Sequence, residues 1–330
     1  MHEICWGMIG VGDVTERKSG PAFQRVPDSR LVAVLGRSEE KTRGYAERHG
    51  IPRWYVDAEA FFADPEINAV YIATPPDSHA SYTLRAARSG LPVYVEKPMA
   101  RTYAECQTMI EACQEAEVPL FVAYYRRTLP AFLMVKEMVE NGSIGDVRFV
   151  SIQLYSSPKE GDYDPDNLPW RVRPEIAGAG YFYDLASHQL DYLDYLFGPI
   201  LSTASIVSNQ AGLYRAEDIV TASWKHSSGV LGSGVWCFTA AEGPQVDRAE
   251  IIGSRGKISF AFFDQLPVQL QNESGLSSFN YPRTDPIQQP LVERVVATLL
   301  GRGDCPSTGE SAARTNLVLE QIIRQANLPG

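Results

Sequence analysis

The chain has 330 residues, of which 44% are hydrophobic, and it can therefore bury a sizeable core. Because one hydrophobic core rarely organises more than about 250–300 residues, this length predicts two domains. The formal net charge of −10 repels phosphate backbones, so nucleic acid is not an expected partner. The five cysteines form no C-x-x-C pair, which argues against a disulfide framework and a structural zinc site.

Membrane insertion and export are not expected either. No apolar run approaches the roughly 18 residues that a membrane span needs. Residues 1–12 have no basic segment ahead of their apolar residues and lead directly into a glycine-rich turn. We therefore expect a soluble, cytoplasmic protein. The histidines show no clustered ligand spacing, so neither a metal nor a flavin is expected.

Residues 1–123 alternate short apolar runs with segments of helical length. The predicted strands are residues 4–9, 31–35, 68–73, 91–95 and 119–125. One intervening helix has a good N-cap in Ser38 and a suitable end in Gly50. Strands joined by helices form parallel sheets with right-handed crossovers. Residues 1–123 are therefore predicted to form a doubly wound α/β domain of the Rossmann type, which binds a dinucleotide.

The pattern changes after about residue 145. Long β-rich runs are separated by Ser/Gly turns, at residues 146–157, 201–209, 218–240 and 249–263. Such runs predict a mostly antiparallel sheet. Helical patterns interrupt it at residues 130–142, 178–198, 290–301 and 308–326. We therefore predict a second, α+β domain over residues 124–330.

A glycine turn follows the first predicted strand. Gly10 and Gly12, followed by Asp13 and Val14, would let backbone N–H groups approach a pyrophosphate at the start of a helix. The third glycine of the G-x-G-x-x-G fingerprint is replaced by Thr15, so the match is incomplete. An ordinary turn can contain the same two glycines. The position of the turn, at the start of a strand–helix series, nevertheless favours a dinucleotide site.

The end of the second strand indicates which nucleotide binds. An NAD site usually offers a carboxylate about 20 residues beyond the glycines, and the expected carboxylate is missing here. Gly36 would leave space, Arg37 and Lys41 are cations, and Ser38 can cap the helix or bind a phosphate. This set favours NADP over NAD. In the alternative interpretation, the two cations are solvated and are balanced by the following glutamates.

Two further strand ends should meet the cofactor, because ligands bind at the carboxyl ends of parallel strands. Residues Thr74, Pro75 and Pro76 form a stiff turn that could wall the nicotinamide. His79 lies just behind this turn and either contacts the cofactor or simply begins the next helix. After the strand at 91–95, we expect Glu96 and Lys97 at the mouth of the same cleft. An ion pair between these neighbours would be geometrically poor, because adjacent strand residues point to opposite faces.

The helical segment 178–198 contains Asp184 and His188, which share one face of a helix with Asp191. A histidine suits general acid/base chemistry, and Lys97 can stabilise negative charge on the same substrate oxygen. Asp184 would orient the imidazole or hold a neighbouring hydroxyl. A lone histidine on an apolar helix is more often a core residue, but a nearby cofactor cleft favours catalysis. We therefore predict Lys97, Asp184 and His188 as the catalytic residues.

Aromatic and arginine side chains are candidates for binding the substrate. Tyr125 and Arg126 follow the last strand of the first domain, and Trp170 and Arg171 precede the Asp/His helix. An aromatic surface with arginine donors suits a polyhydroxylated ring. Arginines on surface loops are usually solvated, so the alternative is that Arg126 and Arg171 are exposed to solvent and bind no substrate.

Four segments together resemble one family. GVGDVTE, ATPPDSH, VYVEKPMA and residues 178–198, in that order, are similar to the glucose–fructose oxidoreductase, inositol dehydrogenase and MocA (Gfo/Idh/MocA) family. The family's E-K-P signature matches Glu96 to Pro98. Its D-x-G-x-H signature matches Asp184 and His188, with Ala186 in place of the glycine. The resemblance covers essentially the whole chain. It implies a Rossmann domain followed by a domain with a large open antiparallel sheet.

The resemblance also implies an activity and an assembly. The implied activity is NAD(P)-dependent oxidation or reduction of a sugar, cyclitol or related polyol, and the alternative is a non-catalytic NAD(P)-binding regulator on the same fold. The implied assembly is a homodimer or homotetramer through the second-domain sheet. Many apolar positions in that sheet favour association: Trp224, Val230, Leu231, Val235, Trp236 and Phe238. A polar, solvated sheet face is the alternative, supported by Ser223, Lys225 and Ser227.

Overall fold

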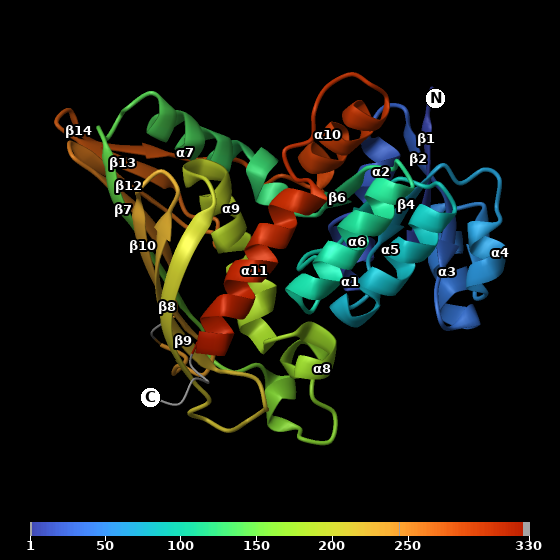
Figure 1. Ribbon diagram of the computed structural model, residues 1–330, viewed down its shortest axis with the longest axis horizontal. Coiled ribbons are helices and arrows are strands. Elements are labelled where there is room, and N and C mark those ends of the chain that lie inside the picture. The colour runs from blue at the N-terminus through green and yellow to red at the C-terminus, as the bar shows by residue number, and fades with distance from the viewer. Residues whose placement is uncertain (1, 244, 326–330) are drawn as a thin grey trace. The chain divides into compact units, whose positions relative to one another are not determined.

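The structure is a computed structural model that describes residues 2–243 and 245–325 (Figure 1). The chain divides into two compact units. The first unit runs up to Thr128 and also includes Thr284–Ala313, and the second contains Leu129–Arg283 and the residues from Arg314 onward. The sequence predicts a boundary at residue 123 and a continuous second domain over 124–330. The structure differs from this expectation, because residues 284–313 return to the first unit.

The first unit is built on a six-stranded parallel sheet in the order β3-β2-β1-β4-β5-β6. This order is that of a doubly wound Rossmann sheet and confirms the predicted fold class. Its strands are β1 (Ile4–Ile9), β2 (Ser29–Leu35), β3 (Arg53–Tyr55), β4 (Ala69–Ile72), β5 (Val93–Val95) and β6 (Leu120–Val122). Its helices are α1 (Asp13–Arg17), α2 (Gly20–Arg25), α3 (Glu39–His49), α4 (Ala58–Phe62), α5 (His79–Arg88), α6 (Tyr103–Glu115) and α10 (Gln289–Leu299).

Local sequence explains these elements. Every residue of β1 is buried, as expected for a strand that is covered on both faces. Helix α3 begins after Ser38, whose hydroxyl accepts a hydrogen bond from the backbone N–H of Lys41. It ends at Gly50, whose φ of 63° is the left-handed conformation that commonly closes helices. Both ends lie where the sequence predicts them.

The second unit contains an eight-stranded sheet in the order β14-β13-β12-β11-β7-β10-β9-β8. Its strands are β7 (Val147–Tyr155), β8 (Ile200–Ser208), β9 (Ile219–His226), β10 (Leu231–Cys237), β11 (Val246–Gly253), β12 (Gly256–Phe260), β13 (Val268–Asn272) and β14 (Gly275–Phe279). All neighbours are antiparallel except β7 and β10. The predicted mostly antiparallel sheet is thus confirmed. The parallel pair is possible because a long connection separates its two strands.

Helices lie over one face of this sheet: α7 (Pro130–Glu140), α9 (Ser187–Phe197) and α11 (Gly309–Gln325) (Figure 1). Helix α11 belongs to this unit from Arg314 onward, and the unit also contains the short helix α8 (Pro174–Ala177). The Tyr192 hydroxyl on α9 donates to the carbonyl of Phe132 on α7 at 2.6 Å. The indole N–H of Trp236 on β10 donates to Gln189 on α9, also at 2.6 Å. These bonds join α9 to α7 and to the sheet. Residue 326, the last of the predicted helix, lies outside the described residues.

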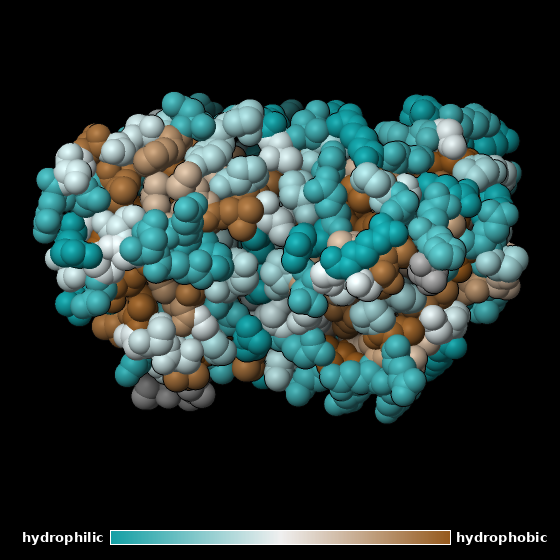
Figure 2. Space-filling view, turned by 90° about the horizontal axis from the view of Figure 1, so that it is seen from above, coloured by the Kyte–Doolittle hydropathy of each residue, from teal (hydrophilic) through white to brown (hydrophobic). Residues whose placement is uncertain are grey.

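The two faces of the large sheet differ in burial. Among the apolar positions from which association is predicted, Trp224, Val230, Trp236 and Phe238 belong to the buried core. Leu231, by contrast, is 53% exposed. The outward face is therefore less apolar than the sequence suggests, because most of the large side chains alternate inward. The molecular surface seen from above mixes hydrophilic and hydrophobic residues (Figure 2).

Polar contacts hold the returning segment 284–313 in the first unit. The buried side chain of Gln288 accepts a hydrogen bond from the Tyr94 hydroxyl at 3.0 Å and donates to Glu96 Oε1 at 2.6 Å. The Tyr71 hydroxyl donates to the same oxygen at 2.7 Å. A buried carboxylate is costly unless it is hydrogen-bonded. Gln288 therefore stabilises the end of β5 as well as its own segment.

Replacing Gln288 by leucine tests this contact, because it deprives the buried Glu96 carboxylate of one donor. We expect Gln288→Leu to lower the free energy of unfolding by about 2–3 kcal/mol. The neighbouring Gln289 donates to Glu293 at the surface, and Gln289→Leu is the matched control, with an expected change within about 0.5 kcal/mol. Urea unfolding followed by circular dichroism measures both variants. Equal stabilities for the two would contradict the role given to Gln288.

Candidate active site

The glycine turn after β1 fits a bound dinucleotide. Gly10 has φ of 100°, and a Cβ there would lie 3.0 Å from the carbonyl carbon of Ala73. At Gly12, no described atom outside its immediate neighbours lies within 4 Å of the position that a Cβ would take. Gly12 and Asp13 are exposed, and Val14 is half-buried. The turn therefore packs closely against the end of β4 at Gly10 and is open at Gly12, where a pyrophosphate can approach the backbone.

Thr15, at the third position of the glycine fingerprint, closes this turn. Its hydroxyl accepts a hydrogen bond from the N–H of Gly12 at 2.9 Å and donates to the carbonyl of Gly12 at 2.8 Å. The carbonyl of Thr15 accepts a hydrogen bond from the Tyr45 hydroxyl on α3 at 2.9 Å. The threonine therefore fixes the backbone of Gly12 and replaces the missing glycine with local hydrogen bonds. Sequence reasoning noticed the substitution but not this contribution.

The end of β2 differs in one respect from the expectation. A Cβ at Gly36 would lie 2.2 Å from the hydroxyl oxygen of Thr42, so Thr42 fills the space that Gly36 was expected to leave for a nucleotide. Gly36 thus permits close packing between α3 and β2. Arg37 and Lys41 are exposed beside it, and Ser38 is the N-cap of α3. The two cations remain the candidates for binding a 2′-phosphate.

The turn after β4 is fixed by Ser78 and His79. The Ser78 hydroxyl donates to the Thr74 hydroxyl oxygen at 2.7 Å. His79 is fully buried, with Nε2 2.8 Å from the carbonyl oxygen of Thr74 and Nδ1 3.1 Å from that of Met99. Burial lowers the pKa of the His79 imidazole. His79 therefore ties the turn after β4 to the loop after β5. This structural role differs from the suggested cofactor contact, because backbone carbonyls occupy both ring nitrogens.

Lys97 is the second residue after β5 and is half-buried. Its backbone N–H donates to Glu96 Oε2 at 3.2 Å. The Glu96 carboxylate points into the unit, where Tyr71 and Gln288 donate to its other oxygen. Glu96 therefore fixes the backbone of Lys97, whereas the sequence suggested contact with the cofactor. Because the sheet is parallel, Lys97 and the glycine turn follow strand ends at the same edge.

In the second unit, Asp184 lies in a π-helical segment, Phe182–Ala186, that leads into α9. The sequence predicts a regular α-helix here, and the wider turn changes the angle between Asp184 and His188. Single π turns are frequent at functional sites. Arg171 Nε donates to Asp184 Oδ2 at 3.2 Å, and the guanidinium of Arg171 lies 4.5 Å from the centre of the Trp170 ring. The structure thus brings Trp170, Arg171 and Asp184 together, and their role in binding the substrate stays a prediction.

His188 lies in the first turn of α9 and is buried. The ring of Phe263 packs against its imidazole, with ring centres 6.1 Å apart and planes inclined by 71°. Asp191, one turn further on, is also buried, and its carboxylate oxygen lies 3.5 Å from the Thr315 hydroxyl. Sequence reasoning missed Phe263. The only signal was the aromatic run that ends β12, and that pattern is typical of a buried strand.

Tyr125 and Arg126 lie in the first unit, in the short helical turn Tyr125–Thr128 that comes shortly after β6. Both are buried, and the Arg126 guanidinium lies 5.2 Å from the centre of the Tyr125 ring. Burial argues against the alternative of a solvated surface arginine, because buried arginines need partners. Arg127 Nη1 donates to the carbonyl of Pro306 at 2.6 Å and anchors the returning segment. A substrate contact of Tyr125 and Arg126 stays a prediction.

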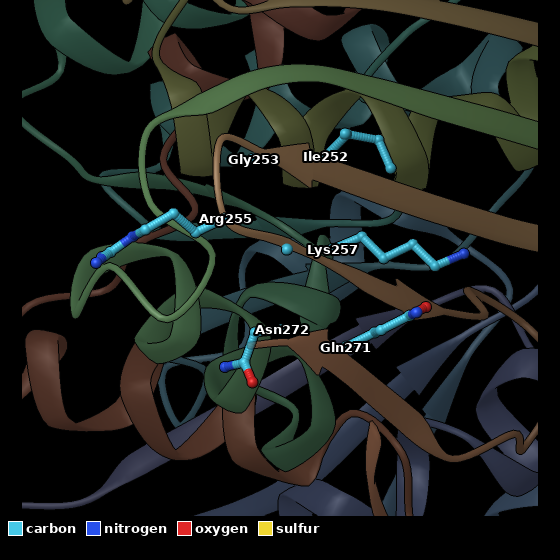
Figure 3. A pocket seen from close by; sticks show the side chains of 7 residues that line it. Ile252, Gly253, Arg255, Lys257, Gln271 and Asn272 are labelled. Carbon is cyan, nitrogen blue, oxygen red and sulfur yellow. The ribbon is translucent and has the colours of Figure 1, made fainter. Parts of the chain in front are cut away.

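A groove of about 430 Å³ lies at one end of the large sheet, and neither Asp184 nor His188 lines it (Figure 3). Its lining residues are Ile252, Gly253, Arg255, Gly256, Lys257, Gln271 and Asn272. The side chains of Arg255 and Lys257 point in opposite directions in Figure 3. Lys257 Nζ bonds Glu250 at 2.8 Å, and Arg255 Nη2 donates to the carbonyl of Gly142 at 3.2 Å. The two cations therefore do not converge on a common ligand.

Within residues 2–243 and 245–325, no group of three or more His, Cys, Asp or Glu side chains is arranged to hold a metal ion. No helix in the described part of the chain has the length and hydropathy needed to cross a bilayer. All five cysteines are free thiols.

Comparisons with known proteins extend the assignment to the whole chain. Residues 4–124 match the oxidoreductase family with an NAD-binding Rossmann fold, and residues 132–259 match the GFO/IDH/MocA C-terminal domain. An oxidoreductase from Formosa agariphila is 38% identical over 319 residues, which cover 96% of this chain and 97% of that protein. A 1,5-anhydro-D-fructose reductase from Ensifer adhaerens is 29% identical over 312 residues, covering 92% and 91%.

A solved structure gives the same result. The aldose–aldose oxidoreductase from Caulobacter crescentus, crystallised with glycerol, superposes with a TM-score of 0.87 at 25% identity and 98% coverage of both chains. The fold and the glycine turn define an oxidoreductase with an NAD(P)-binding Rossmann domain. The chain belongs to the Gfo/Idh/MocA oxidoreductase family, a family of sugar and polyol oxidoreductases. The family resemblance noted in the sequence is therefore confirmed.

Proposed function

We propose that the protein transfers a hydride between NAD(P) and a hydroxyl or carbonyl carbon of a sugar, cyclitol or related polyol. The observation that carries this proposal is the Asp184–Arg171 pair in the turn before the buried His188. The relative that reduces 1,5-anhydro-D-fructose supports a sugar-like substrate. The residues proposed to hold the cofactor are Gly10, Gly12, Asp13, Val14, Arg37, Ser38, Lys41, Thr74, Pro75 and Pro76.

Three side chains are assigned to the proton chemistry. When bound, NAD(P) supplies the group that accepts or donates the hydride. In the oxidation direction, His188 takes the hydroxyl proton as the hydride leaves the carbon, and Lys97 stabilises the negative charge on that oxygen. In the reverse direction, His188 returns the proton to the carbonyl oxygen. Asp184, fixed by Arg171, holds a neighbouring substrate hydroxyl or orients the imidazole.

Alanine substitutions test these roles. Lys97→Ala and His188→Ala should fold and bind cofactor but lose turnover by about 100-fold or more, the usual scale of a positioned proton-transfer group. Lys225 and His2 are exposed, so Lys225→Ala and His2→Ala are controls that should keep full activity. Turnover is followed at the nicotinamide absorbance with a panel of sugars and polyols. Near-normal activity in both site variants would contradict the mechanism. A parent protein that binds the cofactor but transfers no hydride would favour the alternative, a non-catalytic NAD(P)-binding regulator.

We further propose NADP as the preferred cofactor. Arg37 and Lys41 are exposed after β2, and the carboxylates of Glu39 and Glu40 belong to the first turn of α3. A guanidinium at the end of β2 can form charge-assisted hydrogen bonds with a 2′-phosphate. The preference for NADP is supported by Arg37 and Lys41 alone. Gly36 does not support it, because Thr42 fills the space beside that glycine.

Arg37→Ala should weaken NADPH binding by about 1.5–3 kcal/mol, the cost of a charge-assisted contact, and should leave NADH binding nearly unchanged. Arg43 lies on α3, with its Nε 3.8 Å from Glu47 Oε1, so Arg43→Ala is the control for removing a neighbouring cation that does not lie at the end of β2. Fluorescence titrations with both reduced cofactors give the dissociation constants. Equal losses for NADPH and NADH would show that Arg37 does not meet the 2′-phosphate and would favour NAD.

We also propose that the protein forms a homo-oligomer through the outward face of the large sheet. Ile252, Phe149 and Leu231 are direct cross-strand neighbours on β11, β7 and β10. Phe149 is 43% exposed and Leu231 is 53% exposed. A two-fold contact would pack this apolar row against its own copy.

Light scattering at micromolar concentration should give at least twice the chain mass of 36.5 kDa. The double variant Phe149→Glu/Leu231→Glu places charges in the apolar row and should shift the protein toward the monomer. Leu133 is 45% exposed on α7, so Leu133→Glu is a control that should leave the mass unchanged. A monomeric parent protein with no concentration dependence would overturn this proposal.

A further inference from the structure

Phe263 lies in the short segment that follows β12, next to His188. The two rings meet nearly edge-to-face, with centres 6.1 Å apart and planes inclined by 71°. Phe263 is 36% exposed, whereas His188 is 4% exposed. The phenylalanine ring therefore offers part of its apolar surface to the outside while it covers one side of the imidazole.

Asp247, a buried residue of β11, fixes the backbone of this segment. Its carboxylate accepts hydrogen bonds from three successive N–H groups, those of Phe262 at 3.1 Å, of Phe263, and of Asp264 at 2.8 Å. Hydrogen bonds to an ionised carboxylate are about twice as strong as neutral ones. One side chain thus determines the path of the backbone at Phe263.

Phe262 anchors the same segment to the helices. Its ring centre lies 5.4 Å from that of Phe132 on α7 and 5.9 Å from that of Tyr192 on α9. Tyr192 is four residues after His188 on α9, so the cluster connects the segment to the helix that carries the histidine. Phe262 is buried and packs against the helices. Its neighbour Phe263 faces the imidazole of His188.

We propose that Phe263 positions the substrate and selects ring-shaped over open-chain molecules, and that Asp247 is a positioning residue acting through Phe263. The inference rests on the proposed function, because it assigns His188 to the reacting oxygen. A pyranose or cyclitol has a flat face of C–H groups that can pack on an aromatic ring beside the imidazole. An open-chain polyol presents no such face, so it should gain little from Phe263.

Kinetics with a cyclic and an open-chain substrate test the selection. In Phe263→Ala we expect KM for the cyclic substrate to rise about 10-fold, with kcat changed less than about 3-fold, and KM for the open-chain substrate to stay nearly constant. Phe263→Tyr keeps the ring and should retain the preference. Phe279→Ala removes a half-buried phenylalanine at the end of β14, to which no role is assigned, and should have no effect. Equal changes in KM for both substrates would overturn the proposal.

A double-mutant cycle tests the assignment of Asp247. Asp247→Asn keeps the size of the side chain but removes its charge, and it should raise KM for the cyclic substrate by about 3–5-fold. In the Phe263→Ala background, the same substitution should add nothing, because both act through one ring. Additive effects would show that Asp247 acts through general stability, and would remove it from the proposal.

An NMR measurement separates this inference from the proposed function. With five histidines in the chain, ¹³C-labelling of histidine gives few imidazole signals. Phe263→Ala should shift the signal of His188 by removing the ring current, and Phe279→Ala should not. An unshifted His188 signal would overturn the contact itself. A parent protein without hydride transfer would overturn the proposed function and this inference with it, whereas normal turnover with an unchanged substrate preference would overturn this inference alone.

Discussion

The buried carboxylate of Glu96 is the constraint on which the first unit depends. A charge at this depth is costly unless donors surround it. The chain supplies donors from three places: Tyr71 on β4, Gln288 in the returning segment, and the backbone of Lys97. Meeting this requirement fixes the end of β5 and holds residues 284–313 against the parallel sheet. The same carboxylate therefore fixes the backbone of Lys97, from which the Lys97 side chain extends.

Carboxylates organise the second unit in a similar way. Arg171 fixes Asp184 in the π turn before α9, and Asp247 fixes the segment that carries Phe263. Apolar packing joins α7, α9 and the sheet into a rigid support, but charge-assisted hydrogen bonds set the positions of the residues near His188. The two units thus supply different parts of the proposed chemistry. The first holds the dinucleotide turn and Lys97, and the second holds the acid/base pair and the aromatic surface beside it.

Local patterns predicted most of the fold, because strand–helix alternation, the Ser38 cap and the Gly50 helix end depend on neighbouring residues. What the sequence could not show depends on distant contacts. Gln288 bonds Glu96 across 192 positions, and no periodicity records such a bond. For the same reason, the sequence could not reveal that Thr42 fills the space beside Gly36 or that His79 spans two backbone segments. The sequence did not indicate a role for Phe263, because an aromatic residue near the end of a strand usually belongs to the hydrophobic core.

The proposed reaction is direct hydride transfer between a substrate carbon and the nicotinamide, in which His188 accepts or donates the proton. The most direct measurement uses sugars and cyclitols deuterated at the reacting carbon and follows the label into the reduced cofactor by mass spectrometry and NMR. We expect one deuterium at C4 of the nicotinamide with the parent protein, and a rate lower by about 100-fold or more with His188→Ala. Reduced cofactor that carries no deuterium would contradict direct hydride transfer, and label transfer at an equal rate in the His188 variant would contradict the role given to His188.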